Sequence, residues 1–447
     1  MKLSRTNKLV FNWCTILYLF FVLFSIFGFQ CKSANNKIKI EFNTKDTIYD
    51  ESGCLYKSYN KLVMAGYQGW FAAQGDASER GWYHYKANCG FEPGCSTIDM
   101  WPDMSEYSKP YETPFSFANG QKASLYSPYD AETVDVHFKW MKEYGIDGVH
   151  MQRFVVEING SKANGKRHFN KVLENALKAS VKYGRAISIM YDLSGCKKED
   201  IAYVAADFKE LQKQFDLFDN LKNPTYLRHN GKPLVSIWGV GFNDKRKYST
   251  ADVEALVTKL KGPNNRVAVL LGVPYYWRTF GKDTEQNPAL HALIKKCDVI
   301  MPWAVGRFKM ESYNASVVAE DVKWSKANGV DYLPLVFPGF SWGNLQNNSS
   351  LYNSIPRLKG DFLWKQIAGA KKGGAQSLYV AMFDEIDEGT AIYKVLNQKN
   401  VPLNGTKGKK FIGIEDDLQT DYYLWLTGQG AKWFHNEGSF TETKPVR

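Results

Sequence analysis

Residues 131–154 read AETVDVHFKWMKEYGIDGVHMQRF, and this stretch contains the repeating unit from which the fold can be predicted. Residues 131–144 carry apolar side chains at helical spacing, and residues 145–154 form a short apolar run typical of a buried strand. Gly145, between the two parts, is a helix-stop residue. The stretch therefore predicts a helix that ends at a glycine and leads directly into a strand.

The same pattern recurs along the chain. Apolar runs rich in Val, Ile, Leu and aromatic residues are each followed by a polar or aromatic cluster and then by a helical pattern. The runs span residues 62–71, 145–154, 185–195, 232–241, 266–277, 297–307, 331–342 and 376–385, and amphipathic stretches between them include 131–144, 169–183, 200–215, 251–260 and 362–372. Strands and helices alternating in this way predict an α/β fold, a (β/α)₈ TIM-type barrel with a single catalytic domain.

The N-terminus has the pattern of an export leader. Basic residues at positions 2, 5 and 8 precede an uncharged apolar run from Leu9 to about Phe29. Residues 1–35 are therefore interpreted as a signal peptide or a lipoprotein leader. Cys31 closes the run in a context that resembles a lipoprotein processing site, and the run is also long enough to remain as a membrane anchor. We expect an exported protein, either periplasmic or attached to the outer membrane or cell surface.

The rest of the chain is assigned to the barrel domain, residues 36–435, and a tail, residues 436–447. The long loop at residues 72–129, after the first strand, is expected to lie on the catalytic face, where the loops that follow barrel strands gather. Its Cys89 and Cys95 are close enough in sequence to form a small bridge in an exported protein, and the odd number of cysteines after the leader argues against a fully paired framework. One last helix is expected after residue 415.

Bulk charge does not identify a partner. The net charge is +11, but the basic residues are spread over predicted helix faces, so a nucleic-acid partner is not expected. No Cys or His spacing resembles a zinc site, no glycine-rich phosphate loop is found, and no cofactor is predicted.

Residues at the ends of the predicted strands are the candidates for the site, because strand ends point into the mouth of a barrel. Aromatic rings, amides, histidines and carboxylates together suit a sugar, whose C–H faces stack on rings and whose hydroxyls need hydrogen-bonding partners. Core packing is the alternative interpretation for any single aromatic residue. The substrate-binding candidates are Tyr67, Gln68, Trp70, His150, Gln152, Arg153, Tyr191, Asp192, Trp238, Tyr275, Tyr276, Trp303, Arg307, Trp342 and Asp384.

The eighth run leads into the acidic segment YVAMFDEIDEGTAIY, residues 379–393. Glycosidic hydrolysis needs one carboxylic acid to protonate the leaving oxygen and a second carboxylate as nucleophile or base. Glu385 and Glu388 are three residues apart and can lie on one side of a helical turn, which makes them the catalytic candidates. Asp384 and Asp387 are expected to orient neighbours or to cap a helix starting near Thr390. A solvated helix N-terminus and a calcium site are the alternatives.

The motif FDEIDEGT resembles the Glu-x-x-Glu-Gly-Thr element of glycoside hydrolase family 99 and its bacterial 71/99-like relatives, and GYQGWF (residues 66–71) resembles the first strand of that group. The likeness extends from Gly66 through the segment TDYYLWLTGQGAK. It implies a metal-free, retaining, endo-acting enzyme on α-mannan, with Glu385 as a general base on the sugar 2-hydroxyl and Glu388 as the general acid. The start of the motif departs from the family, which typically has an Asn-Glu-Trp-like sequence there.

The sequence thus favours an exported glycoside hydrolase acting on an oligo- or polysaccharide with α linkages, mannan-type by resemblance. A catalytically silent surface glycan-binding protein on the same scaffold is the alternative from another class. A barrel enzyme of another reaction type, such as a glycan lyase or transferase, remains as a third hypothesis because barrels support many chemistries.

Overall fold

The computed structural model describes residues 51–160, 162–405 and 408–447, and the predicted leader at residues 1–35 lies outside them. The described residues form one compact unit. Within its described part, no helix combines the length and the apolar character needed to cross a membrane.

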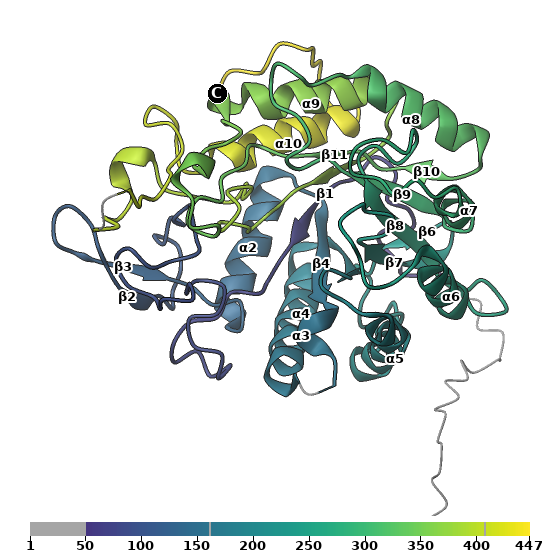
Figure 1. Ribbon diagram of the computed structural model, residues 1–447, viewed down its shortest axis with the longest axis horizontal. Helices are drawn as coiled ribbons and strands as arrows, with labels where there is room; N and C mark the ends of the chain where they lie inside the picture. Colours follow the sequence, from purple (N-terminus) through teal and green to yellow (C-terminus); the bar gives the residue numbers. More distant parts are fainter. Residues whose placement is uncertain (1–50, 161, 406–407) are drawn as a thin grey trace, which may run out of the picture. The chain divides into compact units, whose positions relative to one another are not determined.

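The core of this unit is a ring of parallel strands (Figure 1). In ring order the strands are β1 (Val63–Tyr67), β4 (Gly148–Phe154), β5 (Ala186–Asp192), β7 (Lys232–Trp238), β8 (Ala268–Pro274), β9 (Val299–Trp303), the two pieces β10 (Asp331–Tyr332) and β11 (Leu335–Val336), and β12 (Leu378–Val380). β10 pairs with β9, whereas β11 pairs with β12, which in turn pairs with β1. The seventh strand, interrupted at Leu333 and Pro334, therefore closes the ring, and the (β/α)₈ prediction is confirmed.

Helices follow the strands and surround them. They are α2 (Ala131–Tyr144), α3 (Val155–Ile158), α4 (Ala163–Tyr183), α5 (Lys198–Phe215), α6 (Thr250–Lys261), α7 (Ala289–Ile294), α8 (Ser316–Ala327), α9 (Asp361–Lys372) and α10 (Tyr422–Phe434), with 3₁₀ turns η1 (Ser349–Leu351), η2 (Leu358–Gly360) and η3 (Gln398–Asn400). As the sequence predicts, α2 and α4 each end at a glycine in the left-handed conformation, Gly145 at φ 77° and Gly184 at φ 59°.

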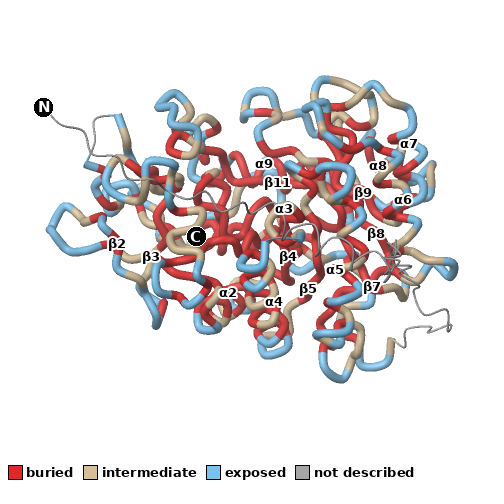
Figure 2. The backbone as a smooth tube through the Cα atoms, turned by 60° about the horizontal axis from the view of Figure 1, so that its bottom comes forward, coloured by how far each residue is buried: buried red, intermediate tan, exposed pale blue. Residues whose placement is uncertain are grey.

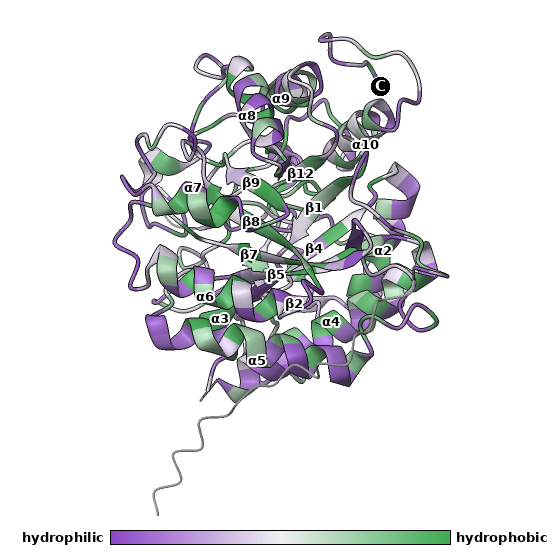
Figure 3. Cartoon of the chain, turned by 90° about the vertical axis from the view of Figure 1, so that its right-hand side faces the viewer, coloured by the Kyte–Doolittle hydropathy of each residue, from purple (hydrophilic) through white to green (hydrophobic). Residues whose placement is uncertain are grey.

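Two apolar layers hold the barrel together. One fills its interior and includes Met190, Leu270 and Tyr379, and the other lies between the strands and the helices and includes Val149, Ile189 and Leu256. Figure 2 shows that the barrel strands are mostly buried, and Figure 3 shows hydrophobic strands surrounded by helices that contain both hydrophilic and hydrophobic residues. Because side chains alternate along a strand, neighbouring positions belong to different layers.

Strand β4 shows this alternation. His150 points into the barrel, where its Nδ1 lies 2.7 Å from the hydroxyl of Ser188. Arg153 points outward and donates two hydrogen bonds to Asp207 of α5, which also accepts a hydrogen bond from the hydroxyl of Tyr191 at 2.7 Å. The side chains of Arg153, Tyr191 and Asp207 are all buried. The ion pair therefore joins the barrel to its helical layer in a place that water does not reach.

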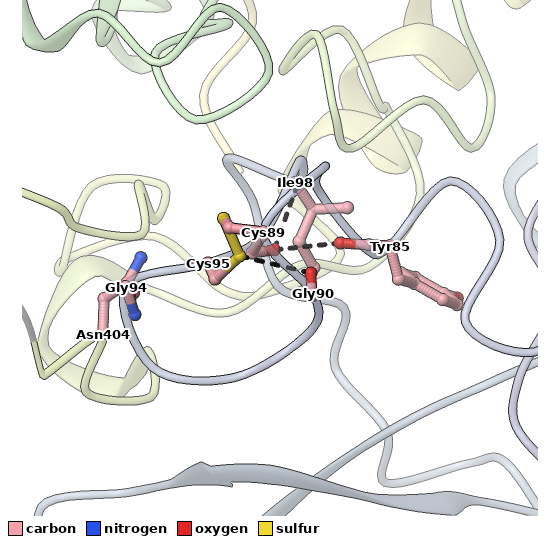
Figure 4. Close-up of a disulfide and its surroundings, with 8 residues drawn as sticks. Tyr85, Cys89, Gly90, Gly94, Cys95, Ile98 and Asn404 are labelled. Atoms are coloured by element: carbon pink, nitrogen blue, oxygen red, sulfur yellow. Dashed lines mark hydrogen bonds between the residues drawn. A yellow bond between two sulfur atoms is a disulfide. The ribbon is translucent and has the colours of Figure 1, made fainter. Parts of the chain in front are cut away.

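The predicted loop at residues 72–129 contains its own hairpin, β2 (Tyr111–Ser116) with β3 (Lys122–Leu125), and another hairpin pairs β6 (Arg228–His229) with β7. Cys89 and Cys95 form a disulfide in this loop, beside a hydrogen bond from the Gly94 N–H to Asn404 (Figure 4). Cys54, Cys196 and Cys297 are buried free thiols.

The loop is tied to the active-site face by Asp99. This fully buried carboxyl accepts hydrogen bonds from the hydroxyl of Ser341 and from the N–H groups of Gly343 and Asn344, both at 2.7 Å. The backbone N–H of Asp99 donates to the carbonyl of Ile386. Loop 72–129 therefore holds the segments that follow β11 and β12.

We expect Arg153→Met to lower the free energy of unfolding by about 3–5 kcal/mol, because it leaves the Asp207 carboxylate buried without its cation. Denaturant titration measures the change. The double variant Arg153→Met/Asp207→Leu should recover most of the loss, because it removes both charges. Lys372→Ala, which breaks an exposed pair with Glu442, serves as the control and should change stability by less than about 1 kcal/mol. A single Arg153 variant as stable as the control would contradict the role given to this pair.

Candidate active site

The acidic segment begins with a clamp between the last and the first strand. Asp384 is fully buried, and its carboxyl accepts hydrogen bonds from the backbone N–H groups of Gln68 at 2.7 Å and Gly69 at 2.9 Å. Burial raises the pKa of Asp384 to about 7, although these two hydrogen bonds oppose the shift. Asp384 thus joins the exit of β12 to the exit of β1, and its oxygens are occupied by backbone rather than facing a cavity.

The chain then forms a turn at residues 386–389 instead of a helix. The expectation of a helix starting near Thr390 is wrong, since the next α-helix begins at Tyr422. The N–H groups of Thr390 and Ala391 instead return to the carbonyl of Glu385, at 3.1 and 2.9 Å. Asp384 and Asp387 therefore do not cap a helix here.

Glu385 is held by two hydrogen-bond donors. The side-chain amide of Gln68 donates to one carboxyl oxygen, and the hydroxyl of Thr390 donates to the other. Burial, followed by the charges of Glu388 and Asp387, raises the pKa of Glu385 well above its usual value. The two donors favour the ionised form and fix the orientation of the carboxyl group.

Glu388 is placed differently. Its side chain lines a cavity of about 610 Å³, and among the described residues no side chain or N–H group forms a hydrogen bond with its carboxyl group. Burial, with the charges of Asp387 and Asp192, raises its pKa to about 8, while His84 opposes the shift. A carboxyl group in these surroundings retains its proton at neutral pH and has a cavity into which to donate it.

The charge of Glu388 contributes to the raised pKa of Glu385, so the two carboxyl groups do not titrate independently. The donors around Glu385 stabilise its ionised form, whereas the carboxyl group of Glu388 has no such donor among the described residues. One carboxylate and one carboxylic acid side by side can act as base and acid in the same reaction.

The walls of the Glu388 cavity come from the ends of neighbouring strands. Trp303 ends β9 and Arg307 follows it, Trp342 follows β11, and Glu388 follows β12. Arg307 is held in place by a hydrogen bond from its Nε to Asp283. Four residues predicted from sequence therefore meet around one cavity.

Other predicted residues extend this inner surface. Trp238 packs edge-on against Trp303 with ring centroids 5.1 Å apart, and a side chain in place of Gly272 would collide with the Trp238 ring at 2.5 Å. Asp192 ends β5 and is near enough to raise the pKa of Glu388. Tyr275 packs against Phe308 of the cavity wall at 5.4 Å.

Four other predicted residues lie away from this cavity. Tyr67 faces α2, where its hydroxyl lies 2.8 Å from Nδ1 of His137, and Arg153 and Tyr191 bind Asp207 on the helix side of the sheet. His150 lies inside the barrel, stacked on Tyr379 at 5.3 Å, and burial lowers its pKa to about 3. Strand alternation explains the outward positions of Tyr67, Arg153 and Tyr191, because a residue next to an inward one on a strand faces the helices.

His84 is a residue of this region that was not among the candidates. Its ring stacks on Trp70 with centroids 3.9 Å apart, its Nδ1 lies 3.5 Å from Asp387, and its Nε2 lies 3.4 Å from Glu157. Burial alone would lower the pKa of His84, but the contacts with these two carboxylates raise it above its usual value. Only its place in an aromatic stretch of the long loop, WYHYK, marked it in the sequence.

Several buried polar atoms near the strand ends have no partner within the described residues. They are Gln68 Oε1, Trp70 Nε1, Gln152 Oε1, Trp238 Nε1 and Asp387 Oδ1. Unpaired buried polar groups are uncommon in folded proteins, so each of these atoms has a hydrogen bond still to form. The described residues contain no group of three or more His, Cys, Asp or Glu side chains that could hold a metal ion.

Comparison with solved structures gives the same fold. Two structures of the GH99 endo-alpha-mannosidase from Bacteroides thetaiotaomicron, one of them in complex with BIS-TRIS-propane, superpose on this chain with TM-scores of 0.61 and 0.60. Sequence identity is 15% and 16%, and the alignments cover 86% and 85% of this chain and 100% and 98% of the mannosidase chain. This chain therefore shares its barrel fold with these mannosidase structures. No protein-family model and no curated protein matches the sequence.

We expect Glu388→Gln to stabilise the protein in a pH-dependent way. Because the pKa of Glu388 is raised in the folded state, the folded protein holds a proton that the unfolded chain releases, so this group lowers stability progressively as pH rises from about 4.5 to about 8. The variant lacks this loss, and its free energy of unfolding should exceed that of the unmodified protein by about 1–3 kcal/mol at pH 8, with little difference at pH 4.5. Thermal melts across this range test the expectation, and a pH-independent difference would contradict it.

Proposed function

We propose that this protein is an exported glycoside hydrolase that cleaves α-linked glycans of mannan type, with retention and at internal bonds, using Glu385 as base and Glu388 as acid. The observation that carries the proposal is the contrast between the two carboxyl groups. Glu385 is oriented by donors from Gln68 and Thr390. The carboxyl group of Glu388 has no hydrogen-bond partner among the described residues, faces a cavity and has a pKa raised to about 8.

The proposed reaction takes its steps from the motif resemblance, and the contrast between the two carboxyl groups supports the roles that the resemblance implies for them. The Glu385 carboxylate accepts the proton of the sugar 2-hydroxyl, and that oxygen attacks the anomeric carbon as the glycosidic bond breaks. Glu388 gives its proton to the leaving oxygen. In the second step water attacks the anomeric carbon and the bond from that carbon to the 2-oxygen breaks. Glu388 takes a proton from the water, and Glu385 returns its proton to the released 2-oxygen. The first attack is intramolecular, so orientation of the sugar supplies much of the rate.

The walls of the cavity support a sugar as the ligand. Trp303 and Trp342 offer aromatic faces for C–H groups, and Arg307 together with Glu388 offers polar contacts for hydroxyls. The volume of about 610 Å³ lies in the range of small-molecule sites. The mannan preference rests on the motif resemblance and on the fold shared with the mannosidase.

Export is supported by the disulfide between Cys89 and Cys95, because such bonds persist mainly in oxidising compartments. The apolar leader at residues 1–35 supplies the targeting segment in this proposal. After export the protein is periplasmic or located at the outer membrane or cell surface, with Cys31 as the site of lipid attachment if the leader is that of a lipoprotein.

Each of Glu385→Gln and Glu388→Gln should reduce turnover at least about 10²- to 10⁴-fold, because each removes one proton-transfer group. The leaderless protein would be incubated with α-mannans, α-glucans and arabinoxylans, and released sugars identified by mass spectrometry. Glu112→Gln, an exposed change on β2, serves as the control and should retain activity.

Retained activity in either site variant would refute the assignment. Glycan binding without product from the unmodified protein would indicate a binding protein, and ultraviolet-absorbing unsaturated ends would indicate a lyase.

The rate should also fall as pH rises through about 8. Glu388 is active as the protonated acid, and above its pKa of about 8 that form disappears. A pH profile of kcat/KM on the substrate found above measures this limb. Activity that continues to rise to pH 10 would show that Glu388 is not the general acid.

A further inference from the structure

A second cavity lies near the acidic segment. Its volume is about 750 Å³, and its walls come from the long loop at positions 79–86 and from the connection between β4 and α4. His84 lines this cavity and also lies 3.5 Å from Asp387, the residue before Glu388. One side chain therefore separates the second cavity from the acidic cluster of the candidate active site.

The start of helix α4 forms part of the wall. Ala163, Asn164 and Gly165 of its first turn line the cavity, no acidic residue lies in that turn, and the side chain of the N-cap residue Lys162 makes no capping hydrogen bond. The first N–H groups of a helix have no partner within the helix, and the N-terminus carries a partial positive charge. This wall of the cavity is therefore suited to an anion.

A buried cation in the same wall points to the same chemistry. The side chain of Arg80 is only 6% exposed, donates from Nη2 to Glu157 and lies over the ring of Tyr83 at 3.5 Å. Its Nη1 is buried and has no acceptor within the described residues. An arginine placed in this way has a hydrogen-bond donor still to be satisfied.

The charges of the cavity do not balance. Its two carboxylates are already paired, Glu157 with Arg80 and Glu79 with Arg167. Lys86 and Lys162 also line the cavity, and neither forms an ion pair with a described residue. Two ammonium groups and a helix N-terminus therefore remain without an opposing charge.

We propose that this second cavity is a glycan subsite for a sugar residue that carries an anionic group, either a uronic-acid carboxylate or a sulfate ester. The inference rests on the proposed function, because it places this residue on the same glycan chain that the Glu385–Glu388 pair cleaves. The anionic group lies against the first turn of α4, with Lys86 and Lys162 beside it. The subsite gives the enzyme a preference for acidic over neutral chains.

The test uses binding to the leaderless Glu388→Gln protein, so that no probe is consumed. Calorimetry at low salt would compare a neutral α-mannan oligosaccharide, the same oligosaccharide bearing sulfate esters, and a glucuronate-substituted mannan oligosaccharide. At least one anionic probe should bind about five- to tenfold more tightly than the neutral one, and the difference should shrink as salt is raised. The two anionic probes distinguish a sulfate from a carboxylate site.

The most informative variant adds Asn164→Asp to the leaderless Glu388→Gln protein. It is nearly isosteric, and it places a carboxylate in the first turn of α4, which favours the helix but repels a bound anion. The anionic preference should fall to about one while the melting temperature stays the same or rises, so that a loss of binding cannot be assigned to unfolding. Lys86→Ala/Lys162→Ala should also reduce the preference.

Lys323→Ala/Lys326→Ala on α8 removes two exposed lysines away from the cavity and should leave the preference intact. Equal binding of neutral and anionic probes, no binding of any anionic probe, or a preference that survives Asn164→Asp would overturn the proposal. An equal loss in the α8 control would overturn it too, since the effect would then reflect net charge alone.

The experiments can contradict the proposed enzyme and the proposed subsite independently. Hydrolysis of glycans by the unmodified protein with no preference for acidic chains would contradict only the subsite. Preferential binding of an anionic probe without hydrolysis of any glycan would contradict the proposed enzyme and support the binding site.

Discussion

The hydrogen bonds from the backbone of Gln68 and Gly69 to the buried carboxyl of Asp384 are the contact on which the candidate site depends. They join the first and last strands where the barrel opens. The same Gln68 that is held by its backbone also directs its side-chain amide at Glu385. The position of the proposed base is therefore set by main-chain hydrogen bonds in a place that excludes water, and side-chain flexibility contributes little to it.

This arrangement carries an electrostatic cost. Glu385, Asp387 and Glu388 lie in one turn, Asp192 adds its charge from β5, and burial raises the pKa values of both glutamates. The histidine of the long loop is the cation that opposes this shift at Glu388. A site that holds a carboxylate beside a carboxylic acid at neutral pH needs this repulsion, so part of the folding stability is given up to keep the pair ready for proton transfer.

Sequence patterns predicted the barrel well because the spacing of apolar residues within each strand and helix depends on which of its faces is buried. The ring order and the helix ends follow from eight apolar runs and from glycines such as Gly145. The same patterns placed Trp303, Trp342 and Glu388 at strand ends. These three residues line one cavity, because the strand ends meet at one face of the barrel. The same reasoning could not tell which neighbours on a strand face inward, and so Arg153 was grouped with residues of the mouth.

What the sequence could not show are contacts between distant segments. Nothing near His84 indicates that it will lie between Asp387 and Glu157, which are separated from it by 303 and 73 positions in the chain. The turn after Glu385 is another case. Its local pattern suits a helix N-terminus, but the carboxyl of Asp384 accepts hydrogen bonds from the residues after β1, and the chain forms a turn at residues 386–389 instead of a helix.

The buried carboxyl of Asp99 has a consequence for how a ligand would be received. It ties the segment of Trp342 to the loop that carries His84 and the disulfide, so the walls of both cavities are fastened to one another by main-chain hydrogen bonds. Segments linked in this way lose little conformational entropy when a ligand arrives. The walls of the two cavities are therefore preorganised, and the binding energy of a glycan is available for distorting and orienting the sugar at the bond that breaks.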